Sequence, residues 1–571
     1  MKTGKPILIG CLVFPLILIV AFGIGFCSSA GKLGSGVSVP SNAWLVLDPA
    51  GLINDYNEIQ SSGIFGTGIT SAEELTARIK AASTDKRIKG MLIKPGFLEV
   101  SYPNLGEISI AIAQFKGSQK PVIAYGTMMS QKDYLLCAMA DSIWMEPSAS
   151  AGLLLEGVSA NLMFYKEALQ KLGIRMHVMQ SGEFKGAGEP YTRTELSAGT
   201  RANLEKALKA RYDKLVGDIA TYRNIDSTRV IEVLENRDDI FISASMAKDY
   251  GLIDRAGSLD ALKLQYGITK DNSISIDDYS GKQPSAKAQK VAVVNLSGSI
   301  AAGPDYGSES MISASKVRKI IEAIEKDKTI KAVVLRVNSP GGSALESELI
   351  YQQISQLKKK LPVVVSMGGV AASGGYYISC AGQYIYADPY TITGSIGVIM
   401  TLPETKELGT KLGLRSQTLR YGKFAGPINL FETYDPALLE SFRRSSEGVY
   451  TEFKQRVSES RQIPMDLMPE VAEGRIWSSD DALALKLIDA VGNLQDAIGK
   501  AADLAKLSDY SVTNYPTRVS IYQALKESGI FQMLDRELKL RHGDPAEQIK
   551  DLLLSEFGPN QWLYRCPYSL D

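Results

Sequence analysis

A lysine in the first half of the chain is missing from the matching segment of the second half. Gly182-Glu-Phe-Lys-Gly186 matches Gly422-Lys-Phe-Ala-Gly426, 240 residues further on, and this sets Lys185 against Ala425. A lysine amine acts as a general base only when it is neutral. Lys185 is therefore a candidate base that only one copy has kept.

A serine in the second half shows the opposite pattern. Glu146-Pro147 matches Asp388-Pro389 at an offset of 242, which sets Leu153 against Ser395. A serine hydroxyl is a weak nucleophile and needs an adjacent base. Because each half keeps only one of the two groups, the sequence predicts a single composite site in which Lys185 activates Ser395.

The environment decides whether a lysine can serve as that base. The ordinary lysine pKa is about 10.4, and burial can lower it by the roughly 2–3 units that catalysis near neutral pH needs. Lys185 is directly flanked by uncharged residues, but Glu183 and Glu189 are near in sequence. An ion pair with either carboxylate would raise the pKa of Lys185 and defeat the proposed role.

Other side chains compete for the roles of base and nucleophile. The chain has 2 histidines: His177 lies in a predicted strand and His542 in charged sequence, so a histidine triad is poorly supported. Ser373, in Ala371-Ala-Ser-Gly-Gly375, opens a predicted helix whose dipole favours an anionic centre. It is the rival nucleophile, with a helix N-cap as its structural alternative. Ser181, four residues before Lys185, is a candidate for orienting the amine.

Acyl transfer also needs backbone N–H groups that face the charge developing on the carbonyl oxygen. Glycine pairs that follow strands can turn such groups outward, and two follow predicted strands here, in Asn338-Ser-Pro-Gly-Gly342 and at Gly368-Gly369. The matching segment of the first half, Lys94-Pro-Gly96, is shorter, which agrees with an inactive first half. The candidate oxyanion residues are Gly341, Gly342 and Gly369.

The elements that must position these residues form an α/β pattern. Short β-branched runs alternate with amphipathic segments in both halves, which is typical of βαβ units and a parallel sheet covered by helices. The duplication predicts repeats over 43–270 and 290–505. A Ser-, Asp-, Lys- and Pro-rich linker over 271–289 joins them, and residues 506–571 form a tail of unassigned role.

The N-terminus carries an uncharged run over 7–26 that follows two lysines. Twenty residues of helix rise about 30 Å, the thickness of a hydrocarbon core. We therefore predict a membrane anchor over 7–28 and a Gly/Ser-rich spacer over 29–42. The lysines favour a cytoplasmic N-terminus over 1–6 and an exported bulk of the chain. A cleaved signal peptide is the competing interpretation.

Composition excludes several function classes. Lysine plus arginine and aspartate plus glutamate both number 63, so no global field favours nucleic acid, and no nucleic-acid partner is expected. The 5 cysteines are scattered, without metal-ligand spacing or a disulfide framework. No metal and no cofactor are expected.

Three glycine-rich segments, in this order, are similar to the signatures of the signal peptide peptidase A (protease IV) family. They are Asn338-Ser-Pro-Gly-Gly-Ser343, Ser366-Met-Gly-Gly-Val-Ala-Ala-Ser-Gly-Gly-Tyr-Tyr377 and Thr393-Gly-Ser-Ile-Gly-Val398. The resemblance covers roughly residues 43–500 and is to the long, duplicated, membrane-anchored bacterial form. It implies tandem ClpP/crotonase-like α/β domains and a Ser/Lys dyad divided between the repeats, to which Ser395 and Lys185 correspond.

The resemblance also implies an activity. It indicates a membrane-bound serine endopeptidase that degrades cleaved signal peptides and similar apolar peptides. Such an enzyme would be a homo-oligomer, with a tetrameric ring as the expected form. Residues 7–28 would hold it in lipid at the bacterial inner membrane, with its catalytic domains outside the cytoplasm. The alternatives are a crotonase-like acyl-transfer enzyme and a non-catalytic membrane scaffold. Retention of one serine and one lysine in different halves argues against the scaffold.

Overall fold

The computed structural model describes most of the chain up to Ser520 and a short strand near the C-terminus. The described residues are 38–60, 71–281, 288–303, 311–423, 425–426, 428–520 and 563–565. The predicted anchor over 7–28, the residues before it and His542 lie outside these ranges. Of the helices within them, none combines the length and the apolar character that a membrane crossing requires.

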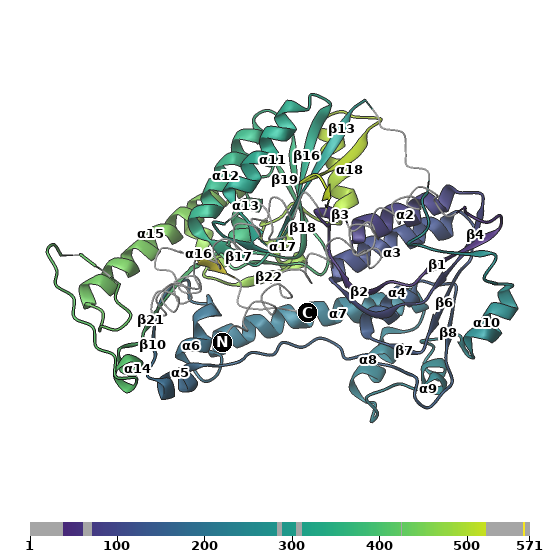
Figure 1. Ribbon diagram of the computed structural model, residues 1–571, viewed down its shortest axis with the longest axis horizontal. Coiled ribbons are helices and arrows are strands. Elements are labelled where there is room, and N and C mark those ends of the chain that lie inside the picture. The colour runs from purple at the N-terminus through teal and green to yellow at the C-terminus, as the bar shows by residue number, and fades with distance from the viewer. Residues whose placement is uncertain are drawn as a thin grey trace, which may run out of the picture.

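The first repeat is built on a parallel sheet with helices on both faces (Figure 1). α2 (Ala72–Thr84), α3 (Tyr102–Gly117) and α4 (Gln131–Ala138) share one apolar core with one face of the sheet. α10 (Leu259–Tyr266) packs against Trp44 on the other face. The strands, in spatial order, are β11 (Arg255–Ala256), β8 (Ser142–Met145), β6 (Val122–Gly126), β4 (Ile88–Ile93), β1 (Ala43–Leu47) and β12 (Ser273–Ser275).

The second repeat has the same plan. α11 (Ala314–Lys326), α12 (Ala344–Lys358) and α13 (Gly374–Ser379) share a core with one face of its sheet, and α18 (Leu494–Leu504) covers the other. The strands, in spatial order, are β22 (Ile476–Ser478), β20 (Ile392–Gly394), β18 (Val363–Ala372), β16 (Ile330–Ser339), β13 (Lys290–Ser297) and β24 (Ser511–Tyr515), with β19 (Tyr384–Ala387) and β23 (Ala490–Val491) continuing from β18. These two sheets confirm the predicted duplicated α/β architecture.

Two edge strands fall outside the repeats as the sequence delimits them. β12 lies within the predicted linker over 271–289, and β24 follows residue 505. They occupy equivalent places, since β12 pairs with β1 and β24 pairs with β13. Both strands are short and largely polar, so their sequence carries little of the apolar signal that marks a strand. The exact boundaries of the repeats remain predictions.

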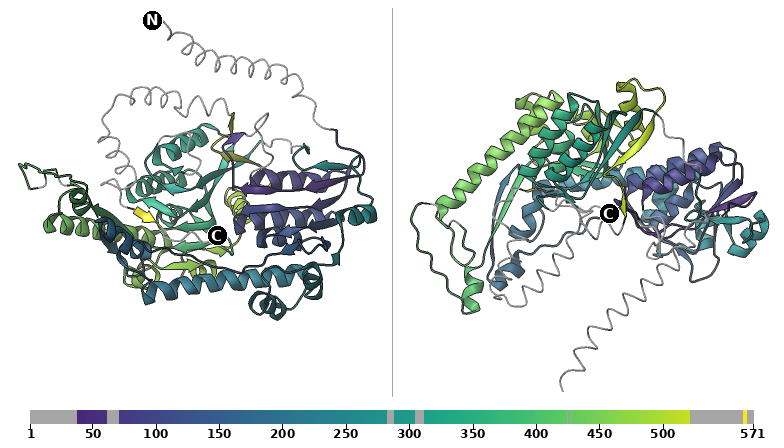
Figure 2. Two further views of the ribbon diagram at one scale, coloured as in Figure 1. Left: turned by 60° about the horizontal axis from the view of Figure 1, so that its bottom comes forward. Right: turned by 45° about the horizontal axis from the view of Figure 1, so that its top comes forward.

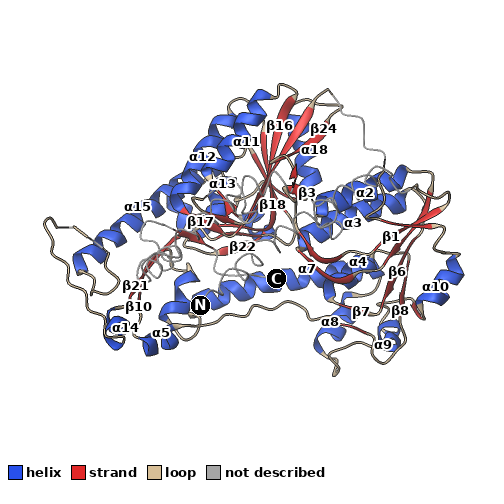
Figure 3. Ribbon diagram, viewed as in Figure 1, coloured by secondary structure: helices blue, strands red, loops and turns tan. Residues whose placement is uncertain are grey.

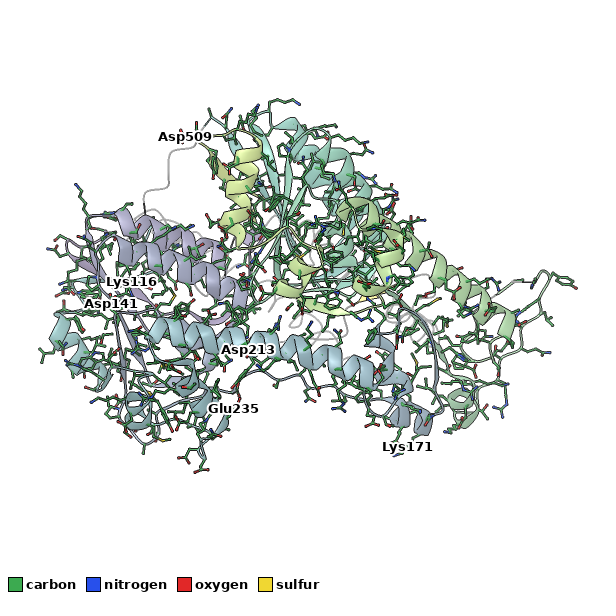
Figure 4. All side chains as sticks on the ribbon, turned by 180° about the vertical axis from the view of Figure 1, so that it is seen from behind. Lys116, Asp141, Lys171, Asp213, Glu235 and Asp509 are labelled. Atoms are coloured by element: carbon green, nitrogen blue, oxygen red, sulfur yellow. The ribbon has the colours of Figure 1, made fainter. Side chains whose placement is uncertain are left out.

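A third sheet joins the two repeats (Figure 3). β10 (Arg175–Ser181) of the first repeat pairs antiparallel with β21 (Val398–Glu404) of the second along its whole length. Figure 4 shows how far the first repeat extends, because Lys171 lies at the opposite end of the molecule from Lys116 and Asp141. The sheet then continues through β26 (Leu563–Arg565), β17 (Gly341–Ser343), β14 (Ser299–Ile300) and β15 (Met311–Ile312).

A long helix runs along both repeats (Figure 2). α7 (Ala198–Arg223) packs Leu204 and Ala207 against Ile392 of the second repeat. Further along, its Leu215 enters the core of the first repeat. The other elements are β2 (Ala50–Ile53), β3 (Ile59–Gln60), β5 (Gly96–Val100), β7 (Met128–Met129), β9 (Gly152–Leu153), α5 (Lys166–Leu172), η1 (Gly186–Gly188), α6 (Glu189–Thr192), α8 (Ser227–Glu235), α9 (Ala244–Asp249), α14 (Lys406–Lys411), α15 (Pro436–Arg461), η2 (Met465–Leu467), α16 (Met468–Val471), α17 (Ser479–Ala484) and β25 (Val519–Ser520).

A buried carboxyl group lies where the repeats meet. Asp388 is 4% exposed, and its Oδ1 accepts a hydrogen bond from the Tyr390 backbone N–H at 2.9 Å. Burial raises its pKa from 3.8 to about 6, although this hydrogen bond and the positive charge of Arg336 oppose the shift. The folded protein therefore holds this proton more tightly than the unfolded chain, and stability falls as pH rises from about 4 to about 6.

Replacing Asp388 with asparagine should remove this cost and keep the acceptor for Tyr390. We expect Asp388→Asn to raise the free energy of unfolding at pH 7.5 by about 1–3 kcal/mol, since one pKa unit corresponds to about 1.4 kcal/mol. The gain should shrink to a few tenths of a kcal/mol at pH 4, because there the carboxyl group is neutral in the folded state and only partly ionised in the unfolded chain. Thermal unfolding at the two pH values measures the difference, with exposed Asp213→Asn as the control. Equal gains at both pH values would contradict the assignment.

Candidate active site

Lys185 belongs to the first repeat but is buried in the second. The chain leaves β10 through a turn in which the Phe184 N–H donates to the backbone oxygen of Glu473 at 2.7 Å. Lys185 is fully buried. A Cβ atom on Gly474 would lie 2.4 Å from the Lys185 nitrogen, so the two backbones are in direct contact.

The lysine amine reaches two serine side chains of the second repeat. Lys185 Nζ lies 2.7 Å from Ser373 Oγ and 2.9 Å from Ser395 Oγ. It also donates to the Ser395 backbone oxygen at 2.7 Å. One chain thus brings together the predicted pair and the rival serine. Burial of an amine in general disfavours its ammonium form, and the neutral form is the one that accepts a proton.

Ser373 stands at a sharp turn between β18 and α13. Its backbone has φ 56° and ψ −117°, a region that residues other than glycine rarely enter. Its N–H donates to the Gly394 oxygen at 2.8 Å, and its side chain makes no hydrogen bond that caps α13. The hydroxyl therefore points to Lys185 and does not act as the N-cap.

Ser395 contacts the Lys185 amine from the segment that follows β20. It follows β20 with a positive φ of 51°, and its N–H donates to the Arg475 oxygen at 2.6 Å. The next residue, Ile396, accepts from the Gly474 N–H at 2.8 Å. Ser395 thus offers the amine both a backbone oxygen and a hydroxyl from a fixed segment.

The three candidate oxyanion residues lie in different places. Gly342 runs beside the start of α13, since a Cβ atom on Gly374 would lie 3.3 Å from the Gly342 nitrogen. The Gly341 N–H donates to Ser339 Oγ at 3.2 Å. Gly369 faces the first repeat, where its nearest neighbours include Ser101. Gly341 and Gly342 both lie beside Gly374, the residue after Ser373, since the same added Cβ would lie 3.3 Å from the Gly341 Cα.

The competing groups named from sequence are engaged elsewhere. His177 Nε2 lies 3.1 Å from Glu404 Oε2, and its ring packs edge-on against Tyr434. The Glu189 carboxylate accepts from the N–H and the hydroxyl of Ser197, at 2.8 and 2.6 Å, at the start of α7. Ser181 Oγ lies 3.5 Å from Ser446 Oγ.

In the first repeat, the turn that corresponds to the Ser373 turn has its polar side chains bonded to one another and to the backbone. Ser130, between β7 and α4, takes part in a capping box with Asp133. The other oxygen of the Asp133 carboxylate accepts from the Leu98 N–H in β5 at 2.9 Å. β5 begins at Gly96, the last residue of the shortened Lys94-Pro-Gly96 segment.

A buried amine in contact with two serine hydroxyls, on an α/β fold, is the arrangement of a Ser/Lys hydrolase. The peptidase family S49 model matches residues 114–270 and 355–508, one stretch in each repeat. The Clp protease model matches residues 306–390. The chain therefore belongs to peptidase family S49 and is a serine peptidase.

Named relatives agree with this assignment. The chain is 32% identical over 467 residues to Protease 4 of Haemophilus influenzae, covering 77% of this chain and 75% of that protein. It is 30% identical over 538 residues to Protease 4 of Salmonella typhi, covering 90% and 86%. It is 31% identical over 457 residues to the chloroplastic serine protease SPPA of Arabidopsis thaliana, covering 78% and 67%. These matches confirm the resemblance seen in the sequence and set aside the acyl-transfer and scaffold alternatives.

Gly474, on which the position of Lys185 depends, carries no signal in the sequence that marks it as part of the site. Gly474→Ala should displace the lysine, because its φ of 79° and the 2.4 Å approach leave no room for a side chain. We expect at least a 100-fold loss of peptide turnover and about 1–3 kcal/mol of destabilisation. Gly448→Ala, which has no atom within 4 Å of the added Cβ, is the matched control and should keep wild-type turnover. A Gly474→Ala enzyme with normal turnover would refute this dependence.

Proposed function

We propose that this peptidase degrades cleaved signal peptides and other apolar peptides, with Lys185 as general base and Ser373 as nucleophile. The observation that carries this proposal is the buried Lys185 amine within 2.9 Å of both hydroxyls. Ser395 then orients the amine. The resemblance to signal peptide peptidase A supports the substrate class.

The geometry favours Ser373 over Ser395, the serine that the repeat comparison put first. Ser373 occupies a strained strand-to-helix turn, the setting that exposes a nucleophile in other hydrolases. Its neighbour Gly374 adjoins the Gly342 nitrogen, so a carbonyl attacked by Ser373 has an oxyanion donor at hand. Ser395 instead binds the amine through its backbone oxygen as well as its hydroxyl, which suits a positioning role.

The reaction then follows from these contacts. Neutral Lys185 takes the Ser373 proton as the hydroxyl oxygen attacks the peptide carbonyl. The Gly342 N–H stabilises the developing oxyanion. The ammonium, held by Ser395, gives its proton to the leaving amine, and a water activated by Lys185 then releases the acyl group from Ser373.

The third sheet supports an extended mode of substrate binding. β26, from the C-terminal end of this chain, lies antiparallel to both β17 and β21. Tyr564 is paired with Gly342, and Leu563 with Ile399. A peptide backbone in this position hydrogen-bonds along two strand edges. It also passes Gly342, which lies beside the turn that holds Ser373. A substrate that takes the place of β26 would therefore present its carbonyl to the nucleophile.

We also propose the location and assembly that the sequence predicts: an anchor over 7–28, catalytic domains outside the cytoplasm and a homo-tetrameric ring. Large apolar side chains on and after the end of α14 support a contact between copies. Leu412, Leu414, Leu419 and Tyr421 are 66%, 51%, 87% and 98% exposed. Four large apolar side chains exposed within ten residues of sequence are more than the scattered single ones that a surface normally carries.

Single substitutions separate the two serines. With a fluorogenic peptide, we expect Lys185→Ala and Ser373→Ala to lose turnover by about 10³-fold or more. Ser395→Ala should lose about 10–100-fold and still form a covalent adduct with a peptidyl phosphonate, located by mass spectrometry. Ser379→Ala, a buried serine bonded to the Gly375 oxygen, is the control. An adduct on Ser395, with Ser373→Ala still active, would restore Ser395 as the nucleophile.

The substrate class has its own test. A synthetic signal peptide should be cleaved within its apolar region by the detergent-solubilised full chain, with kcat/KM at least 10-fold above that of a length-matched polar peptide. Mass spectrometry of the products locates the cleaved bonds. Equal rates for the two peptides would contradict a preference for signal peptides.

A further inference from the structure

A carboxylate of the first repeat bonds the end of β16, the strand that precedes the candidate oxyanion residues Gly341 and Gly342. Asp55, shortly after β2, accepts from Arg336 Nε at 3.0 Å through Oδ1 and from Asn338 Nδ2 at 2.8 Å through Oδ2. The Asp55 and Arg336 side chains are only 8% and 2% exposed. Arg336 and Asn338 belong to β16, so this contact crosses between the repeats.

Asn338 uses the rest of its amide to fill an irregularity in the central sheet. The pairing of β16 with β18 shifts between Val337, which faces Met367, and Ser339, which faces Ala371. Two extra residues of β18 therefore bulge opposite Asn338. Asn338 Oδ1 accepts from the Val370 N–H in this bulge at 3.2 Å, and so replaces a ladder partner that the shifted register removes.

Two backbone oxygens of the bulge also accept hydrogen bonds from side chains. Thr391 Oγ1 donates to the Gly368 oxygen at 2.7 Å. Arg211 of the first repeat donates to the Gly369 oxygen at 3.1 Å. The bulge ends three residues before Ser373, so its shape determines how β18 enters the turn that presents the hydroxyl.

The type of residue at position 55 decides which way the Asn338 amide points. A carboxylate only accepts hydrogen bonds, whereas an amide has one accepting and one donating end. Asp55 therefore selects the NH₂ end of Asn338, which leaves the oxygen for Val370. With an amide at position 55, the Asn338 side chain loses this selection and can turn its NH₂ group toward the Val370 N–H.

We propose that Asp55 is a positioning residue for the reaction. By fixing the Asn338 amide it holds the β18 bulge, and so sets Ser373 against Gly342. This inference rests on the proposed function, in which Ser373 attacks and Gly342 binds the oxyanion. The first repeat then supplies the support for the oxyanion loop as well as the lysine.

An exchange of the two side chains tests the proposal in the full-length enzyme. Asp55→Asn should lower kcat about 10–100-fold and leave KM within about twofold, because alignment of the reacting groups is lost and substrate binding is kept. Asn338→Asp sets two carboxylates face to face and should lower kcat further. In the double variant Asp55→Asn/Asn338→Asp, the amide now at position 55 donates to the carboxylate now at position 338. That carboxylate still accepts from Val370, and the amide oxygen at position 55 still accepts from Arg336. The kcat of the double variant should recover to within about threefold of wild type.

Glu58→Gln is the matched control. Glu58 is another carboxylate of the first repeat that reaches the second, where it pairs with Lys316 of α11 and not with β16. This variant should keep the wild-type kcat even where it lowers Tm as much as Asp55→Asn does. The proposal is overturned if Asp55→Asn lowers Tm but not kcat, or if the double variant is no faster than the slower single variant.

The assay also distinguishes failure of this inference from failure of the proposed function. Ser373→Ala is measured in parallel with the peptide and the phosphonate. If Ser373→Ala stays active, the proposed nucleophile is wrong whatever the Asp55 variants do. If Ser373→Ala is inactive and the exchange gives no rescue, only the role of Asp55 is lost.

Discussion

The antiparallel ladder between β10 and β21 is the interaction on which the rest of the site depends. It carries the chain of the first repeat across the second and ends at Ser181, four residues before Lys185. Backbone hydrogen bonds fix its register, so the amine arrives at a set depth among Gly474, Ser373 and Ser395. A slip of one residue would turn every side chain of β10 to the opposite face. The reactive centre is thus positioned mainly by main-chain pairing.

Polar contacts buried between the repeats complete that positioning. Asp55 and Arg211 reach from the first repeat to backbone and side-chain groups near the end of β18. Arg336 is fully buried, with Asp55, Glu107 and Asp388 as the negative charges that offset its desolvation. Removing Asp55, which bonds Arg336 directly, is costly because the Arg336 charge then loses its hydrogen-bonded partner in a poorly solvated place. The two repeats therefore behave as parts of a single catalytic unit.

The sequence predicts the parts of this structure whose signal is local or repeated. Alternating β-branched and amphipathic segments indicate the two sheets, and the unequal repeats indicate that Lys185 meets a serine of the other half. The repeat comparison put Ser395 ahead of Ser373 as the nucleophile, whereas the φ and ψ angles of Ser373, which the sequence does not reveal, favour the reverse order. Asp55 gives no pattern at all, since its partners lie 281 and 283 residues away. β12 and β24 are too short and polar to be recognised without their neighbours.

The Ser130–Asp133 turn of the first repeat shows how far the two halves have come to differ. The Asp133 carboxylate accepts from the Leu98 N–H, and Leu153 aligns with Ser395 of the second repeat. A return to two independent sites would require a new lysine in the second half, a new hydroxyl in the first and removal of the carboxylate, and none of these steps is useful alone. The two copies are therefore not interchangeable, because Lys185 has no counterpart in the second half and Ser395 has none in the first.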